Sequence, residues 1–83
     1  MTKGTKFTAD YKISCYKERI GGYRSEWVHA TLIAVSDKMA VVEKAEMEEA
    51  GSHRQEYFVA YYEKKEIGKK KRIDCLYNVA EIA

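Results

Sequence analysis

The feature that most constrains the fold is a run of apolar and β-branched residues at positions 26–36, EWVHATLIAVS. Residues branched at Cβ favour an extended backbone, and this run contains four of them: Val28, Thr31, Ile33 and Val35. Both sides of the run are fairly apolar, which is typical of a bent strand shared by two walls of a small barrel. The chain has 83 residues, enough for one domain with a small core, so its other elements must also be short.

Alternation and turn signals predict further short strands around this run. Residues 11–15 place apolar and polar side chains alternately, and a period of two indicates a half-buried strand. Gly21-Gly22 predicts a turn after it, because paired glycines reach positive φ without a Cβ clash. Asp37-Lys38 predicts a second tight turn, followed by a short return strand over residues 39–42.

Two segments in the middle of the chain are harder to assign. The acidic segment at 43–50, EKAEMEEA, favours helix by propensity but has no broad apolar stripe, so we expect a solvated excursion from the barrel. Residues 54–62, RQEYFVAYY, are open to two interpretations. Ser52 followed by Gln55 fits a capping box, and the aromatic residues also fit helical spacing. Aromatic and β-branched residues dominate positions 57–62, however, and we favour a strand.

The C-terminal third predicts a hairpin and a closing turn. The basic run at 64–72 then forms the long tip of a hairpin around Gly68, and residues 72–77 return as a strand. Val79 and Ile82 have the spacing of a terminal helical turn. Together these elements predict an all-β fold, a small SH3-like barrel of about four to five bent antiparallel strands with a C-terminal helical turn.

The sequence also bounds the class of protein. We expect residues 1–10 to form a flexible leader and residues 11–83 to form the domain. A membrane-spanning helix is excluded because no run approaches the ~20 apolar residues that it needs. Full disorder is disfavoured because 46% of the residues are hydrophobic, which is enough to build a core.

Charge is unevenly distributed along a chain whose formal net charge is only +2. Residues 64–72, KKEIGKKKR, carry six basic groups and one glutamate, for a local charge of +5, whereas residues 43–49 carry −3. Clustered cations favour binding of a polyanion, because each neutralised phosphate releases condensed counterions. The candidate nucleic-acid contacts are Lys64, Lys65, Lys69, Lys70, Lys71 and Arg72. A hairpin tip whose lysines discourage edge-to-edge pairing accounts for the same run without a ligand.

The sequence gives little support for a catalytic or metal-binding site. Cys15 and Cys75 lie far apart, and neither has the close cysteine or histidine neighbours of a structural zinc site, so we expect buried thiols in an intracellular protein. His29 lies among apolar strand residues, and no Ser/His/Asp or Cys/His arrangement has a supporting motif. The sequence therefore predicts a chain that is not an enzyme and that uses no metal or cofactor.

Several short motifs follow one another in a definite order over residues 13–82. They are Ile13-Ser14-Cys15, Trp27-x-x-Ala30-x-Leu32-Ile33, Tyr57-Phe58-Val59-x-Tyr61, Arg72-Ile73-Asp74 and a closing Ile82. Their order and spacing resemble the chromo barrel (Tudor-knot) domain that precedes the catalytic domain in MYST-family histone acetyltransferases. Leu76 stands where that family has a tryptophan, and Ala60 stands where it has a histidine.

The resemblance implies a non-catalytic, nuclear module that helps to place an acetyltransferase on chromatin, with acetyl transfer carried out by a domain outside this chain. Chromo barrels that lack a complete aromatic cage are associated with RNA binding. The resemblance therefore also implies contacts with RNA or DNA through residues 64–72. We expect the module to act as a monomer.

Three other functions stay open at this point. A methyl-lysine reader needs aromatic rings around a desolvated cation, and the candidates are Tyr16, Tyr23, Trp27, Tyr61 and Tyr62, although Leu76 removes one wall. A protein-interaction module would dock onto acetyltransferase subunits or a histone tail through the acidic segment and the lysine-rich run. A small phage or bacterial inhibitor of β type is the alternative outside this family.

Overall fold

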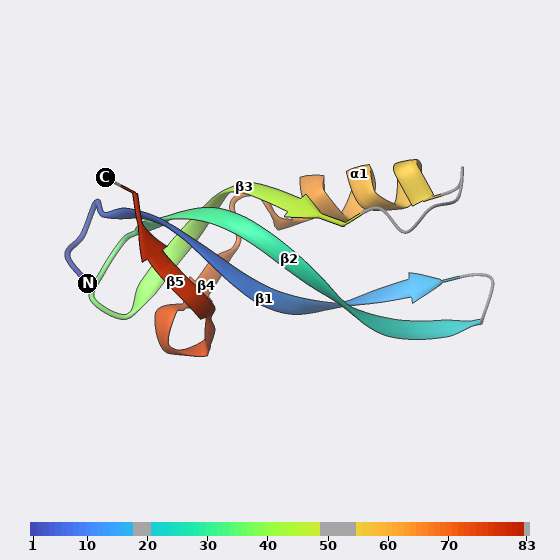
Figure 1. The fold of residues 1–83 in the computed structure, drawn as a ribbon, viewed down its shortest axis with the longest axis horizontal. Coiled ribbons are helices and arrows are strands. Elements are labelled where there is room, and N and C mark those ends of the chain that lie inside the picture. Colours follow the sequence, from blue (N-terminus) through green and yellow to red (C-terminus); the bar gives the residue numbers. More distant parts are fainter. Residues whose placement is uncertain (18–20, 49–54, 83) are drawn as a thin grey trace.

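The computed structural model of the chain describes residues 1–17, 21–48 and 55–82. Antiparallel strands form one curled, half-barrel sheet in the order β4-β3-β2-β1-β5 (Figure 1). The elements are β1 (Lys6–Lys17), β2 (Gly22–Ala34), β3 (Met39–Met47), α1 (Gln55–Glu66), β4 (Lys70–Arg72), a 3₁₀ turn η2 (Ile73–Cys75) and β5 (Tyr77–Glu81). The predicted class, a small and mostly β barrel-like fold, is confirmed.

A long twisted ribbon of β1 and β2 carries most of the core. The register pairs Phe7 with Leu32 and Tyr11 with Val28, so buried side chains alternate on both strands and gather on one face of the ribbon. We call this the inner face. The buried residues on it from these two strands are Phe7, Ala9, Tyr11, Cys15, Val28, Ala30, Leu32 and Ala34. The strand predicted from the apolar run is therefore confirmed, and it ends at Ala34.

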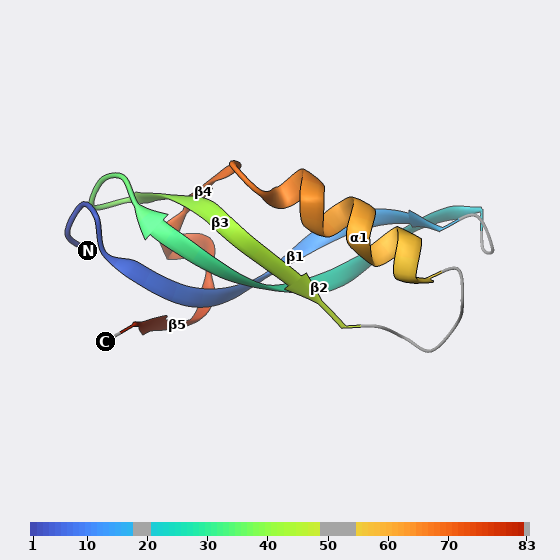
Figure 2. The same ribbon diagram turned by 90° about the horizontal axis from the view of Figure 1, so that it is seen from above.

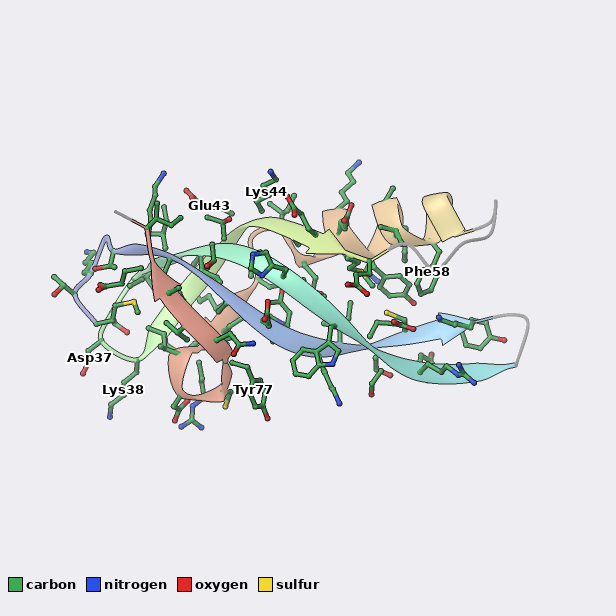
Figure 3. The ribbon with its side chains drawn as sticks, viewed as in Figure 1. Asp37, Lys38, Glu43, Lys44, Phe58 and Tyr77 are labelled. Atoms are coloured by element: carbon green, nitrogen blue, oxygen red, sulfur yellow. The ribbon has the colours of Figure 1, made fainter. Side chains whose placement is uncertain are left out.

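The predicted turn at Asp37-Lys38 joins β2 to β3 at one end of the molecule (Figure 3). Ser36 organises the turn, because its hydroxyl accepts hydrogen bonds from the backbone N–H groups of Lys38 and Met39. The carbonyl of Met39 accepts the N–H of Val35 at 2.9 Å and so closes the loop.

β3 extends further than the sequence suggested. The predicted solvated excursion at 43–50 is wrong for residues 43–47, which continue the strand, and residues 49–50 lie outside the described residues. The strand accommodates the acidic residues because a register shift between Thr31 and Leu32 brings Ala45 onto the inner face while Glu43 stays exposed. Figure 3 shows Glu43 and Lys44 pointing away from the sheet.

β1 also begins earlier than the alternation at 11–15 indicated. Residues 6–10, which were expected to belong to the leader, form the first part of the strand. Phe7 and Ala9 are fully buried there, and the Lys6 carbonyl accepts the N–H of Ile82 at 3.0 Å. This part of the strand is held by contacts with the far end of the chain, which local alternation does not reveal.

The strand predicted over 54–62 is wrong, because residues 55–66 form the helix α1; Arg54 lies outside the described residues. Aromatic residues pack at helical spacing here, with the rings of Phe58 and Tyr62 4.8 Å apart. Polar side chains on the helix also bind backbone groups of the sheet, since Glu63 accepts the N–H of Met47 at 2.8 Å. The inner side of α1 is therefore partly polar, which explains why the sequence of this helix shows no continuous apolar stripe.

The hairpin tip predicted for residues 64–72 is also wrong. Lys64 and Lys65 belong to the last turn of α1, whereas residues 70–72 form the edge strand β4. Gly68 allows the change of direction, because it adopts φ +89°, the left-handed conformation in which glycine commonly ends helices. Its N–H then donates to the carbonyl of Val42 at 2.8 Å and attaches the turn to β3.

The C-terminal segment differs from the prediction in the same way. The strand predicted over residues 72–77 is wrong for residues 73–75, which form the 3₁₀ turn η2. The helical turn predicted around Val79 and Ile82 is also wrong, because residues 77–81 form the strand β5. β5 pairs with the first part of β1, and every one of its residues is exposed. Figure 2 shows β4 and β5 on opposite sides of the central strands.

Candidate functional site

The candidate site begins with the six basic residues of the 64–72 run, which we call the cationic surface. Its members are Lys64, Lys65, Lys69, Lys70, Lys71 and Arg72. They come from the last turn of α1, the following turn and the edge strand β4. In Figure 2, α1 and β4 lie on the side of the sheet away from β5. The fold therefore presents these cations along one edge of the molecule rather than at a loop tip.

A buried glutamate divides the cationic surface into two kinds of lysine. Glu66 is only 2% exposed, and its carboxylate accepts hydrogen bonds from the Tyr11 hydroxyl at 2.9 Å and from Lys69 at 2.8 Å. Lys71 approaches the same carboxylate to 3.1 Å, and its Nζ also lies 4.3 Å from the centre of the Tyr11 ring. Lys69 and Lys71 therefore hold the helix, β1 and β4 together.

The protonation states in this cluster follow from its contacts. Burial works to raise the pKa of Glu66, but hydrogen bonds from Lys69, Lys71 and Tyr11 outweigh it, so the pKa lies below its usual value. Burial, together with the neighbouring carboxylate, raises the pKa of the Tyr11 hydroxyl. Glu66 is therefore ionised and Tyr11 neutral at physiological pH, as the hydrogen bond between them requires.

The remaining cations face solvent. Lys64 and Lys70 are exposed and have no acidic partner among the described residues. Arg72 pairs with Asp74 at 2.8 Å, but both side chains are about two-thirds exposed, and such a pair contributes little and opens easily. Lys65 donates to the Tyr61 hydroxyl at 3.2 Å, and this hydrogen bond raises the lysine's pKa. These four cations are available to a ligand.

Four of the five predicted aromatic residues, all tyrosines, are brought together. The rings of Tyr61 and Tyr62 are 5.1 Å apart, the Tyr62 hydroxyl accepts the backbone N–H of Tyr16 at 2.9 Å, and the rings of Tyr16 and Tyr23 are 5.3 Å apart. We call Tyr61, Tyr62, Tyr16 and Tyr23 the tyrosine strip. It starts beside Lys65 on α1 and ends at the β1–β2 hairpin.

Trp27, the fifth predicted residue, lies elsewhere. Its ring packs edge-to-face on Tyr77 of β5 at 5.5 Å, and Lys12 lies 5.0 Å from its centre. No ring contact within residues 1–17, 21–48 and 55–82 joins Trp27 to the tyrosine strip. Figure 3 places Tyr77 beside β5 and Phe58 between α1 and the β1–β2 ribbon. These contacts place Trp27 with Tyr77 and Lys12 rather than with the tyrosine strip.

Sequence reasoning missed the residues that organise this site. Glu66 is the only acid within the basic run, and that isolation was the available signal for a buried partner of the lysines. Tyr11 was assigned to a strand face, with no indication that it reaches residue 66. Tyr23 was among the aromatic candidates, but only its pairing with Tyr16 in the β1–β2 ladder places it at the end of the strip.

Among residues 1–17, 21–48 and 55–82, the other reactive groups do not form a second site. Cys15 is buried and burial raises its pKa, whereas Cys75 is exposed rather than buried as expected. Asp10 accepts hydrogen bonds from Asn78 and His29, which hold its pKa below the usual value. In the described part of the chain, no cluster of three or more histidine, cysteine or acidic side chains is arranged to hold a metal ion. None of the described helices is long and apolar enough to cross a membrane.

Comparisons with known proteins give no match to this chain among family models, curated proteins or solved structures. The resemblance to chromo barrel domains therefore rests on the sequence motifs alone and stays a prediction. The candidate site rests on the geometry of the chain itself.

Proposed function

We propose that the chain is a non-catalytic module that binds nucleic acid, RNA or DNA, through the cationic surface. The observation that supports this most directly is the arrangement of the six basic residues along one edge, only two of which are engaged by the buried Glu66. Lysines needed only to protect an edge strand would not have to extend onto α1, as Lys64 and Lys65 do.

The number of free cations sets the expected strength of binding. About four phosphate contacts give a slope of log affinity against log salt of roughly −3 to −4 on duplex DNA. Such binding is weak at physiological salt and carries no sequence preference, because phosphate contacts position a ligand without reading its bases. This suits an accessory module that adds affinity to another contact rather than a sequence-specific regulator.

The resemblance described above supplies a setting for the proposal. A chromo barrel of a nuclear histone acetyltransferase would use this surface to hold the enzyme near RNA or DNA on chromatin. The methyl-lysine alternative receives no specific support, because Trp27 lies with Tyr77 and apart from Tyr61. The protein-docking alternative receives no specific support either, since the exposed Glu43 and Glu46 of its acidic segment already pair with Lys6 and Lys44.

Charge reversal of the free lysines tests the proposal. The double variant Lys64→Glu/Lys70→Glu leaves the contacts of Glu66 intact, and Lys3→Glu/Lys12→Glu is a control with the same change in net charge at exposed sites elsewhere. Fluorescence anisotropy with a labelled RNA should show at least about a tenfold loss for the first variant and a salt slope reduced by about 2.

The control double variant should change affinity only slightly, since at 0.1 M salt the Debye length is about 10 Å. Equal losses in both double variants would mean that binding follows net charge rather than this surface. Unchanged affinity in Lys64→Glu/Lys70→Glu would contradict the proposed function.

A further inference from the structure

We propose that the preferred ligand is single-stranded nucleic acid, whose bases stack on the tyrosine strip while its phosphates contact the cationic surface. This inference rests on the proposed function and names its substrate class. It predicts a distinct role for aromatic side chains that edge protection and general charge attraction do not explain.

The first argument is continuity between the strip and the cations. The Lys65 ammonium lies 5.0 Å from the centre of the Tyr61 ring and donates to its hydroxyl, so the first ring of the strip adjoins the end of the cationic surface. Lys64 and Lys65 are also one helical turn from Tyr61 in the sequence. Cations beside stackable rings are the combination that single-strand-binding proteins use.

The second argument is the exposure of the rings. Tyr61 is 56% exposed, Tyr23 71% and Tyr16 45%, although Tyr16 and Tyr23 pack on each other and Tyr61 packs on Tyr62. The hydroxyl of Tyr61 is engaged by Lys65 and that of Tyr62 by the Tyr16 backbone. These bonds fix ring positions while leaving ring surface open for a base.

The third argument is the path of the strip. Tyr16 of β1 lies opposite Tyr23 of β2 in the ladder, but the backbone N–H of Tyr16 points away from β2 and donates to the hydroxyl of Tyr62 on α1. At this position α1 therefore approaches β1 from the side away from β2. Cys15, the preceding residue, faces inward, so the ring of Tyr16 points to the outer face of the ribbon. The strip therefore passes from α1 around the edge of β1.

A flexible strand can follow this bend and a duplex cannot. The molecule measures only about 20 Å across its two short axes, whereas duplex DNA is stiff over about 150 base pairs. A duplex also keeps its bases stacked inside, where exposed tyrosines cannot reach their faces. The same lysines can contact a single strand or a duplex, so any preference for the single strand should come from the tyrosine rings alone.

The test compares an oligothymidylate of about 15 nucleotides with a duplex of the same length, titrated in parallel by anisotropy. The wild-type chain should bind the single strand at least about tenfold more tightly. Tyr23→Ala and Tyr61→Ala should each weaken single-strand binding by about fivefold or more and leave duplex binding unchanged.

Two matched variants show whether base stacking accounts for the loss of single-strand affinity. Tyr77→Ala removes a ring that is 59% exposed, much as Tyr61 is, but lies outside the strip, and it should bind like the wild type. Tyr61→Phe keeps the ring and loses only the hydroxyl bond to Lys65, so it should retain single-strand affinity. Unchanged duplex binding confirms that each variant is folded.

Equal affinity for both forms, or equal losses in Tyr61→Ala and Tyr77→Ala, would overturn the inference. In that case a loss of binding in Lys64→Glu/Lys70→Glu would still support the proposed function. Failure of both nucleic acids to bind would overturn the inference and the proposed function together.

Discussion

The two edges of the sheet differ in how they are held and in what they expose. β4 carries Lys70, Lys71 and Arg72, and it is anchored from inside through the contact of Lys71 with the buried Glu66. β5 has Glu81 as its charged residue, is exposed at every position, and is attached by its ladder to β1. The same sheet therefore has one edge that is charged and anchored by a buried carboxylate, and another that is weakly charged and held by its ladder and by exposed side-chain contacts.

This difference shows that a run of like charges can serve two purposes at once. Part of the basic run stabilises the protein, because Lys69 and Lys71 compensate a buried carboxylate. The rest faces solvent, protects the β4 edge from pairing, and is available to a polyanion. Binding and stability should therefore respond to different residues of the same segment.

The largest expected effect comes from removing the anchor of the β4 edge. Glu66→Ala leaves Tyr11, Lys69 and Lys71 without their common acceptor. Breaking a fully buried pair costs about 3–5 kcal/mol, but the side chains of Lys69 and Lys71 are 49% and 24% exposed and can regain water. We expect a loss of about 2–3 kcal/mol in the free energy of unfolding, measured in urea.

Thiol labelling of the Glu66→Ala variant shows which part of the sheet is destabilised. Cys15 is buried whereas Cys75 is exposed at the start of the β5 side. Glu66→Ala should speed the reaction of Cys15 with a thiol reagent and leave that of Cys75 unchanged. Parallel acceleration of both thiols would mean that the two edges are not independently held.

A smaller effect on the free energy of unfolding is expected at acidic pH. The pKa of Glu66 in the folded state lies below its unfolded value of about 4.5, so its contribution is fully present above that pH and is lost as the pH falls through the folded pKa. Urea unfolding at a series of pH values below 4.5 should show a steeper decline for the wild type than for Glu66→Gln. Parallel curves for the wild type and Glu66→Gln would show that protonation of Glu66 does not cause the loss of stability in acid.

The smallest effect is expected at the β5 edge. Val79 is 42% exposed and Glu81 is exposed, so neither side chain contributes a buried contact comparable to that of Glu66. Val79→Ala and Glu81→Ala should each change the free energy of unfolding by about 0.5 kcal/mol or less. A loss near that of Glu66→Ala in either variant would remove the contrast between the edges.

Much of the fold was predictable from local pattern. Alternation over residues 11–15 and the β-branched run at 26–36 correctly indicated β1 and β2, because a half-buried strand shows its inner face in the sequence. The helix was missed because its inner side carries Tyr62, Glu63 and Glu66, which bind backbone and buried polar groups instead of apolar ones. The aromatic residues of such a helix fit helical spacing, but without an apolar stripe the same residues also fit a strand.

The candidate site was predictable in composition but not in arrangement. The six cations and all four strip residues were identified from the sequence, whereas the order of the strip and the anchoring role of Glu66 were not. Contacts between residues distant in the chain decide these roles, and no local pattern encodes such distances. Trp27 was grouped with the wrong rings for the same reason.

The sequence by itself determined that this chain folds into a small β sheet with a concentrated basic segment, since residue type and alternation act locally. Only the tertiary structure decided which lysines are structural and which are free. The reason is that the carboxylate of Glu66 becomes buried only when α1 docks against Tyr11, 55 residues away in the chain. Burial of that single charge then selects Lys69 and Lys71 as its partners and leaves Lys64 and Lys70 to the solvent.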